Sequence, residues 1–236
     1  MGESGIGSRL KALEERTAAA AARAGRDPAL VTVVAVTKTV PVDLIEEAIR
    51  LGVKHVGENR VQEASAKFES IGRKATWHLV GHLQSNKVKR ALEIFDVIQS
   101  VDTVRLAEAI SQRVIEEQSR NRQRADVLLE VNTSGEASKF GFRPEDVNAA
   151  VEEICVLDGV RVRGLMTVGP IVERPEDARR AFALLRNLAD EVTKLGLPEL
   201  EMKVLSMGMS GDFEVAVEEG STFVRVGTAL FGTRPR

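Results

Sequence analysis

Short apolar runs alternate with longer amphipathic segments along nearly the whole chain. The apolar runs are rich in Val, Ile and Leu and are bounded by turn residues, a pattern typical of strands covered on both faces in a parallel sheet. The predicted strands span residues 33–39, 54–57, 76–80, 95–100, 126–131, 160–165, 202–205 and 222–226. The predicted helices between them span residues 42–51, 60–71, 85–92, 103–118, 144–157, 175–195 and 213–218. Eight strands in regular alternation with helices predict an α/β protein and favour a closed (β/α)8 TIM barrel.

One further helix is predicted before the first strand, and Gly25 and Pro28 end it. Residues 1–28 are therefore expected to form a helix that covers the barrel. No Pro-, Gly- or Ser-rich linker divides the chain, so a single domain over residues 1–236 is expected. An open doubly wound sheet would show the same alternation, but its Gly-x-Gly-x-x-Gly fingerprint is missing after the first strand, where Lys38 begins a different loop.

The composition limits the kinds of molecule that the protein is expected to bind. With 43% hydrophobic and 29% charged residues and a formal net charge of -2, the chain has no electrostatic footprint for nucleic acid or an anionic membrane. No stretch has the length of a membrane-spanning helix, and the N-terminus lacks a signal-peptide core. The single cysteine, Cys155, has no internal disulfide partner. We therefore expect a cytoplasmic protein that binds a small molecule.

Lys38 follows the apolar run Val33 to Val36 and is the first candidate for chemistry. An amine that is partly removed from water at the end of a buried strand loses its proton more easily, as an imine-forming lysine must. The alternative is a lysine that extends from the strand end into water. The apolar run alone does not distinguish an imine-forming lysine from one that extends into water.

Two glycine-containing loops are predicted where barrels often bind phosphate, after the seventh and eighth strands. They are residues 206–212 and 225–229, with hydroxyl groups at Ser210 and Thr228. Backbone N–H groups in such loops approach an anion closely. The first loop does not match the Gly-x-Ser-x-Gly elbow of serine hydrolases. Together with Lys38, the loops point to an aldehyde that carries a phosphate, and pyridoxal 5'-phosphate is the main candidate.

Arg225, at the end of the last predicted strand, has two interpretations. Its guanidinium stays charged, so it can donate a hydrogen bond to an unprotonated pyridine nitrogen and weaken the ring as an electron sink. Alternatively, it pairs with a nearby carboxylate such as Glu218.

Six segments resemble one known family, and together they cover nearly the whole chain. They are Ala35-Val36-Thr37-Lys38, Gly57-Glu58-Asn59-Arg60-Val61-Gln62-Glu63, Trp77-His78-Leu79-Val80-Gly81-His82-Leu83-Gln84-Ser85-Asn86-Lys87, Gly164-Leu165-Met166-Thr167, Ser206-Met207-Gly208-Met209-Ser210-Gly211-Asp212 and Arg225-Val226-Gly227-Thr228. In these segments the sequence is similar to the YggS/PROSC pyridoxal phosphate homeostasis proteins.

The resemblance implies one barrel of the alanine-racemase N-terminal type that binds pyridoxal phosphate on Lys38. It also implies a role for each matching position. These are Ser210, Gly211, Gly227 and Thr228 at the phosphate, Arg225 at the pyridine nitrogen, and Asn59 and Met166 at the ring.

The barrel racemases that this family resembles use a lysine and a tyrosine as opposed bases, but this chain contains no tyrosine. It also ends soon after the eighth predicted strand, where a racemase continues into a second domain. His78 and His82 are the candidates for a replacement base, but we do not expect catalysis by them, nor a metal site. We expect a monomeric, non-catalytic carrier that helps to maintain intracellular pyridoxal phosphate and delivers it to apo-enzymes. The alternatives are an amino-acid racemase of low activity and a class I aldolase-type barrel.

Overall fold

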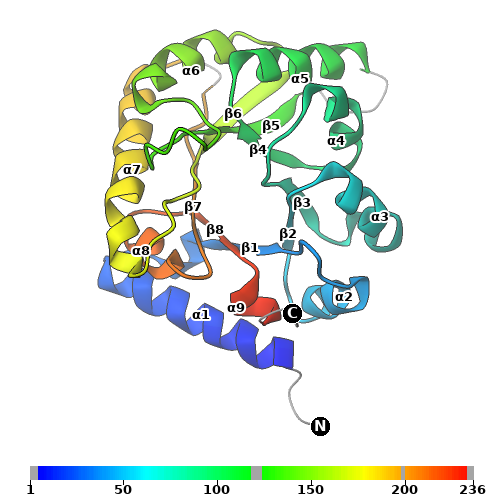
Figure 1. Ribbon diagram of the computed structural model, residues 1–236, viewed down its shortest axis with the longest axis vertical. Coiled ribbons are helices and arrows are strands. Elements are labelled where there is room, and N and C mark those ends of the chain that lie inside the picture. The colour runs from blue at the N-terminus through cyan, green and yellow to red at the C-terminus, as the bar shows by residue number, and fades with distance from the viewer. Residues whose placement is uncertain (1–4, 118–123, 198–199, 233–236) are drawn as a thin grey trace.

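Eight parallel strands close into a barrel in the order β1-β2-β3-β4-β5-β6-β7-β8, as the sequence predicts (Figure 1). The computed structural model describes residues 5–117, 124–197 and 200–232. The strands are β1 (Thr32–Val36), β2 (His55–Glu58), β3 (Thr76–Leu79), β4 (Val97–Val101), β5 (Ala125–Glu130), β6 (Val160–Met166), β7 (Val204–Met209) and β8 (Phe223–Val226). Parallel pairing of β1 with both β2 and β8 closes the barrel.

The helices form a ring around the barrel (Figure 1). They are α1 (Gly5–Arg23), α2 (Val42–Arg50), α3 (Val61–Ile71), α4 (Val88–Ile94), α5 (Val104–Glu116), α6 (Val147–Cys155), α7 (Arg179–Lys194), α8 (Phe213–Glu218) and α9 (Thr228–Phe231). Short 3-10 turns are η1 (Pro28–Leu30), η2 (Gly72–Lys74), η3 (Ser85–Lys87), η5 (Pro144–Asp146) and η6 (Pro175–Ala178). Three predicted helices, 85–92, 144–157 and 175–195, therefore begin as 3-10 turns. The predicted end of the helix 103–118 lies outside the described residues.

Most strand boundaries lie within one or two residues of the prediction, but two strand ends differ by more, and both of these differences affect the candidate site. The first strand ends at Val36, so Lys38 lies in the loop beyond β1 and not on the strand. The next residue, Thr39, has φ of 61°, a left-handed conformation that a strand cannot contain. The seventh strand continues to Met209 instead of ending at residue 205, because a register shift against β8 and the φ of 89° at Gly208 let it bend.

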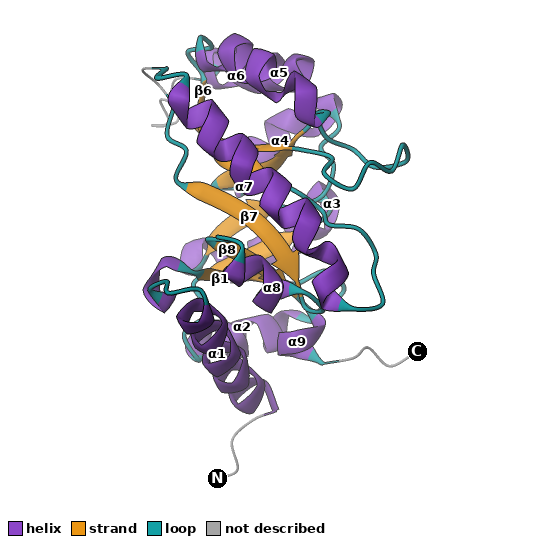
Figure 2. Cartoon of the chain, turned by 90° about the vertical axis from the view of Figure 1, so that its left-hand side faces the viewer, coloured by secondary structure: helices purple, strands orange, loops and turns teal. Residues whose placement is uncertain are grey.

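Helix α1 completes the ring of helices. It packs against α8, α9 and α2, at the periphery of the barrel (Figures 1 and 2). Because α9, after the last strand, has only four residues, α1 occupies the place that a long eighth helix would take. The N-terminal helix therefore covers a side of the barrel. Figure 2 also shows the long loops projecting from the side on which α9 lies.

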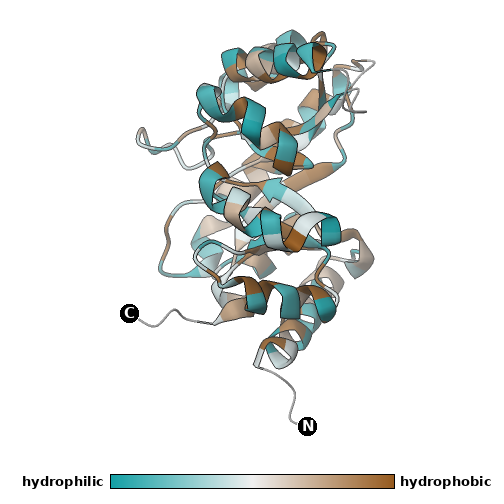
Figure 3. Ribbon diagram, turned by 90° about the vertical axis from the view of Figure 1, so that its right-hand side faces the viewer, coloured by the Kyte–Doolittle hydropathy of each residue, from teal (hydrophilic) through white to brown (hydrophobic). Residues whose placement is uncertain are grey.

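The main core lies between the barrel and the helices. Its largest fully buried side chains include Trp77, Phe95, Phe182 and Phe213. The outer helices alternate hydrophilic and hydrophobic segments, as expected for helices with one face on the barrel (Figure 3). No helix in the described part of the chain combines the length and apolarity needed to cross a bilayer.

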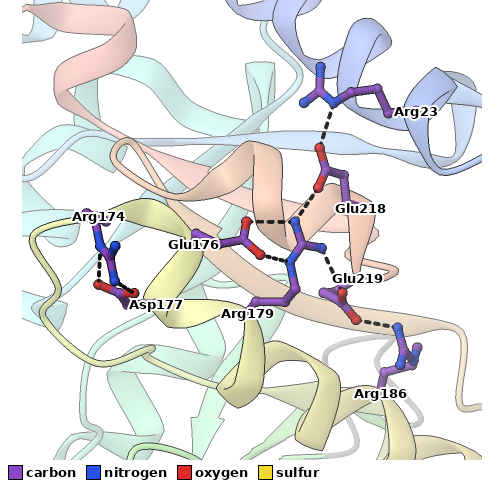
Figure 4. Close-up of polar contacts among 8 residues, drawn as sticks. All are labelled: Arg23, Arg174, Glu176, Asp177, Arg179, Arg186, Glu218 and Glu219. Atoms are coloured by element: carbon purple, nitrogen blue, oxygen red, sulfur yellow. Dashed lines mark hydrogen bonds and ion pairs between the residues drawn. The ribbon is translucent and has the colours of Figure 1, made fainter.

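A network of ion pairs links α8 to its neighbours (Figure 4). Arg23 of α1 pairs with Glu218 at 2.7 Å, and Arg179 of α7 pairs with Glu218 at 2.5 Å and with Glu219 at 2.8 Å. Arg186 also pairs with Glu219. Exposed pairs contribute little individually, but a network spanning three helices restrains their relative positions. Helix α8 begins directly after the loop that follows β7, so the network restrains the end of that loop.

Candidate functional site

The parallel strands bring most of the predicted site residues to the C-terminal end of the barrel. Six of them line one pocket of about 360 Å³ with Val36, Val80, Val168 and Met209. These six are Asn59, Ser210, Gly211, Arg225, Gly227 and Thr228. The geometry therefore joins Asn59, just after β2, with residues after β7 and at the end of β8 that lie more than 140 positions further along the chain.

Two predicted site residues, Lys38 and Met166, do not line the 360 Å³ pocket. Lys38 is half-buried and lines two adjoining pockets, one of about 120 Å³ with Gly227 and Thr228, and one of about 710 Å³ with Asn59. Met166 ends β6 and is fully buried, and it lines none of these three pockets. Val168, two residues further on, lines the 360 Å³ pocket in its place.

The loops after β7 and β8 are joined through one hydroxyl group. The Oγ atom of Ser210 accepts hydrogen bonds from the backbone N–H groups of Gly227 at 3.1 Å and Ala229 at 3.2 Å. A Cβ atom added at Gly211 would meet open space, so the pocket reaches its backbone. In the described chain, the N–H groups of Gly211 and Thr228 donate no hydrogen bond. A glycine-lined pocket with unused N–H donors and two hydroxyl groups fits a phosphate group.

A buried clamp holds the peptide groups on both sides of Lys38. Lys67 of α3 donates hydrogen bonds to the carbonyl oxygen of Thr37 at 2.6 Å, to Glu58 Oε1 at 2.6 Å and to Glu63 Oε1 at 2.8 Å. Thr37 Oγ1 donates to Glu58 Oε1, and the backbone N–H of Thr39 donates to Glu63 Oε1, both at 2.5 Å. The loop that carries Lys38 is thus fixed to β2 and α3, and the strained φ of Thr39 is held by these contacts.

The two carboxyl groups of the clamp differ in electrostatics. Burial raises the pKa of Glu58, against the hydrogen bonds from Lys67 and Thr37, and its Oε2 atom is buried without a hydrogen-bond partner. Burial also acts to raise the pKa of Glu63, but the hydrogen bonds from Lys67 and from the Thr39 amide, with the charge of Lys38, lower it. The pKa values of the two carboxyl groups are therefore shifted in opposite directions, upward for Glu58 and downward for Glu63.

Arg225 is 4% exposed and forms part of the pocket wall. Its guanidinium donates to Ser206 Oγ and to the carbonyl oxygen of Thr167, both at 2.7 Å. Burial lowers its pKa to about 10, against the opposing charges of Glu130 and Asp212, so it remains a cation at neutral pH. The alternative pairing of Arg225 with Glu218 is wrong. Glu218 points outward from α8 and pairs with Arg23 and Arg179 instead (Figure 4).

A chain of buried hydrogen bonds leads from Arg225 into the interior of the barrel. Ser206 Oγ donates to Gln99 Oε1 at 2.6 Å, and Gln99 Nε2 lies 2.9 Å from His78 Nδ1. His78 Nε2 lies 2.9 Å from His55 Nδ1. Because the amide nitrogen of Gln99 can only donate, His78 Nδ1 must accept, and its Nε2–H must donate to His55. Every donor in this chain of hydrogen bonds therefore points away from Arg225.

Burial and the neighbouring His55 lower the pKa of His78 to about 3, so this histidine is neutral. Both of its ring nitrogens are engaged, which removes it as a candidate base. His82 differs, because it lines the 710 Å³ pocket with Lys38. Its Nδ1 lies 2.8 Å from Asp102 Oδ2, and its ring stacks on Phe140 with 4.0 Å between centroids. Within the described residues, no cluster of three potential metal ligands occurs.

Sequence reasoning missed five polar residues that organise the site, namely Glu58, Glu63, Lys67, Gln99 and Ser206. A signal existed for three of them. Gln99 interrupts the apolar run at residues 95–101, and Glu63 and Lys67 have the i, i+4 spacing of a helical ion pair. The sequence did not show that these side chains would be buried.

Comparison with known proteins assigns this chain to a family. A family model described as "Alanine racemase, N-terminal domain" matches residues 8–235. A protein of Aquifex aeolicus named "Pyridoxal phosphate homeostasis protein" is 44% identical over 230 residues, which cover 96% of this chain and 97% of the relative. The chain belongs to this family of pyridoxal phosphate homeostasis proteins. A human relative of the same name is 38% identical, covering 98% of this chain and 88% of its own length. The resemblance seen in the six sequence segments is confirmed.

Solved structures agree. PipY of Synechococcus elongatus PCC7942, a structure described as having PLP bound, matches with a TM-score of 0.82 and 38% identity, covering 96% of this chain and 100% of PipY. A protein of Bifidobacterium adolescentis described as unknown matches with a TM-score of 0.90 and 41% identity, covering 96% and 94% of the two chains. Alanine racemase of Clostridium difficile matches with a TM-score of 0.68 at 14% identity, over 94% of this chain and 56% of the enzyme, and shares the fold alone.

Proposed function

We propose that this protein binds pyridoxal 5'-phosphate as part of pyridoxal phosphate homeostasis, holds it through Lys38 as a Schiff base, and does not turn over a substrate. The observation that carries the proposal is the convergence of Lys38, the Ser210 loop and Arg225 on adjoining pockets at one end of the barrel. An amine, a phosphate cradle and a buried cation are the three groups that this cofactor requires of a protein.

Each group of the cofactor has residues to receive it. The hydroxyl groups of Ser210 and Thr228 and the backbone at Gly211 and Gly227 bind the phosphate. Arg225 donates to the pyridine nitrogen, and Asn59 borders the ring site, where it lines both the 360 Å³ and 710 Å³ pockets. The role of Met166 at the ring stays a prediction that rests on the resemblance.

When bound, the cofactor supplies an aldehyde carbon that reacts with amines and a ring that accepts electrons. Arg225 remains charged at neutral pH and therefore disfavours a second proton on the ring nitrogen, which weakens electron acceptance. The chain has no tyrosine to act as an opposed base, and His78 is neutral and fully engaged. These features support storage and delivery of the cofactor to apo-enzymes by a monomer, without catalysis.

One observation favours a second candidate function, an amino-acid racemase of low activity. His82 shares a pocket with Lys38 and is oriented by Asp102, and a carboxylate-oriented histidine is a common general base. Exchange of the α-proton of L-amino acids in deuterated water, lost in both Lys38→Ala and His82→Gln, would establish this function and overturn the non-catalytic proposal. The third interpretation, an aldolase-type barrel, requires retention of a phosphosugar after borohydride reduction.

The test of the proposal is covalent labelling. Purified protein is mixed with pyridoxal phosphate, its absorption spectrum is recorded, and the sample is reduced with borohydride and mapped by peptide mass spectrometry. We expect an imine absorption band and a pyridoxyl mass on the peptide that contains Lys38. Lys38→Ala should lose both, whereas Lys89→Ala, which changes an exposed lysine of α4, should retain both. Labelling of Lys38→Ala to the level of the unmodified protein would refute the assignment.

A further inference from the structure

The larger of the two pockets described beside Lys38 lies mostly outside the proposed cofactor site. It has a volume of about 710 Å³ and is lined by Lys38, Asn59, Arg60, Val61, Gln62, Gly81, His82, Gln84 and Lys87. A volume of this size is typical of pockets that hold small organic ligands. Only Lys38 and Asn59 belong to the proposed cofactor site.

The lining of this pocket is basic. Lys38, Arg60 and Lys87 are basic side chains, His82 adds an imidazole ring, and none of the described residues that line the pocket is an aspartate or a glutamate. Gln62 and Gln84 add side-chain amide donors. Cations gathered around one cavity repel each other, and a bound anion relieves that repulsion.

Arg60 and Lys87 make no hydrogen bond or ion pair through their side chains within the described part of the chain. The nearby carboxylates are already engaged. Glu63 accepts hydrogen bonds from Lys67 and from the backbone N–H of Thr39, and Asp102 is hydrogen-bonded to His82. Among the described residues, neither cation therefore has an internal counter-ion.

The barrel topology places this pocket apart from the phosphate cradle. Strand β1, which leads to Lys38, is flanked by β8 on one side and by β2 on the other. The cradle follows β7 and β8, whereas Arg60 and Lys87 follow β2 and β3. A cofactor that extends from Lys38 toward the cradle therefore leaves the side of β2 and β3 open.

We propose that this pocket is a second anion site, in which Arg60 and Lys87 bind the carboxylate or phosphate group of a small organic ligand that meets the cofactor at Lys38. The inference rests on the proposed function only for the presence of the cofactor. The planar guanidinium of Arg60 suits two-point binding of either oxyanion, and Lys87 supplies a point charge. The pocket thus provides a place from which a second metabolite can influence retention or release of the cofactor.

The test uses protein loaded with pyridoxal phosphate and reduced with borohydride, so that the cofactor fills the cradle. Inorganic phosphate and, separately, succinate are titrated by calorimetry at low ionic strength. We expect at least one of them to bind, and Arg60→Gln and Lys87→Gln each to weaken that binding about tenfold. The anion that binds identifies the preferred oxyanion. Lys89→Gln, a change in the first turn of α4, two residues after Lys87 and outside the pocket, should leave the dissociation constant unchanged.

Absence of binding by both anions, or equal dissociation constants in all four proteins, overturns the second anion site. The proposed function fails on a different result, namely absence of a pyridoxyl mass on Lys38. In that case the same titration is made on unloaded Ser210→Ala protein, in which the cradle is weakened. Loss of the remaining phosphate binding on addition of Arg60→Gln still supports the anion site, and its retention refutes it.

Discussion

The ammonium group of Lys67 lies 2.6 Å from the carbonyl oxygen of Thr37, the residue immediately before Lys38. The same group binds Glu58 and Glu63, and Glu63 accepts the N–H of Thr39, the residue immediately after Lys38. One buried side chain thus organises the peptide groups on both sides of the proposed cofactor lysine. Precise placement of a reactive amine depends on such supporting contacts.

Lys67→Met is expected to loosen this loop and leave a buried carboxyl group at Glu58 without its cation. We expect a loss of about 3 kcal/mol in the free energy of unfolding. We also expect a weaker imine absorption band at a given concentration of pyridoxal phosphate. Urea unfolding and absorption titration measure the two effects. Lys74→Met is the control, because Lys74 pairs with Glu46 at an exposed site on the outside of the barrel.

A purely structural role for Lys67 would lower stability and leave the imine dissociation constant of the folded protein unchanged. Lys67→Arg keeps the positive charge and should therefore recover part of the imine band. An unchanged band in Lys67→Met, measured well below its unfolding midpoint, contradicts the clamp.

Ser210→Ala and Thr228→Val should each weaken binding of pyridoxal phosphate by about 1 to 3 kcal/mol, the usual range for hydrogen bonds to a charged group. Ser210→Ala also removes the acceptor for the N–H groups of Gly227 and Ala229, so its effect should be the larger. Fluorescence or absorption titration gives the dissociation constants. Thr193→Val on α7, whose hydroxyl bonds only Ala189, is the matched control and should bind normally. Wild-type affinity in both cradle variants would show that the phosphate lies elsewhere.

Gln99→Leu should break the chain of hydrogen bonds that ends at Arg225. It leaves His78 Nδ1 without its donor and the Ser206 hydroxyl without its acceptor, at a cost of about 1 to 3 kcal/mol in unfolding free energy. Because the Ser206 hydroxyl that Arg225 contacts is then no longer held by Gln99, we also expect the absorption maximum of bound cofactor to shift. Nitrogen NMR checks the orientation directly, since His78 should carry its proton on Nε2 in the unmodified protein. A proton on Nδ1 would reverse the assigned chain.

Glu130 should make stability depend on pH near neutrality. Burial and the charge of Asp102 raise its pKa to about 7, against the opposing effect of Arg225. A carboxyl group with a raised folded-state pKa favours the folded state below its unfolded pKa of about 4.3, and this contribution is lost as the pH rises through 7. Its magnitude is up to about 4 kcal/mol.

The comparison of Glu130→Gln with the unmodified protein isolates this contribution, because every other titratable side chain is the same in both proteins. We expect the variant to gain stability relative to the unmodified protein as the pH rises from 5 to 8, measured by urea unfolding. A stability difference that does not change over this range would mean that Glu130 is ionised throughout.

The architecture was predictable because hydrophobic periodicity and turn residues are local properties. They correctly indicated eight strands with intervening helices, and hence a closed barrel. The parallel barrel then implies that residues after different strands meet at one end. That rule predicts that the loops with Ser210 and Thr228 lie together with Arg225, and the family resemblance adds Gly211 and Gly227 to them.

The tertiary structure decided which polar side chains are buried and which residues they contact. The sequence allowed Arg225 to pair with Glu218, but the barrel interior gives it Ser206 and Thr167. It identified Lys38, but only packing of α3 against β2 creates the clamp of Glu58 and Lys67. Burial changes the strength of hydrogen bonds and the pKa of carboxyl groups, and burial arises from contacts between distant segments. The sequence alone therefore determined the barrel and the positions of the candidate ligands, and the fold determined their electrostatics.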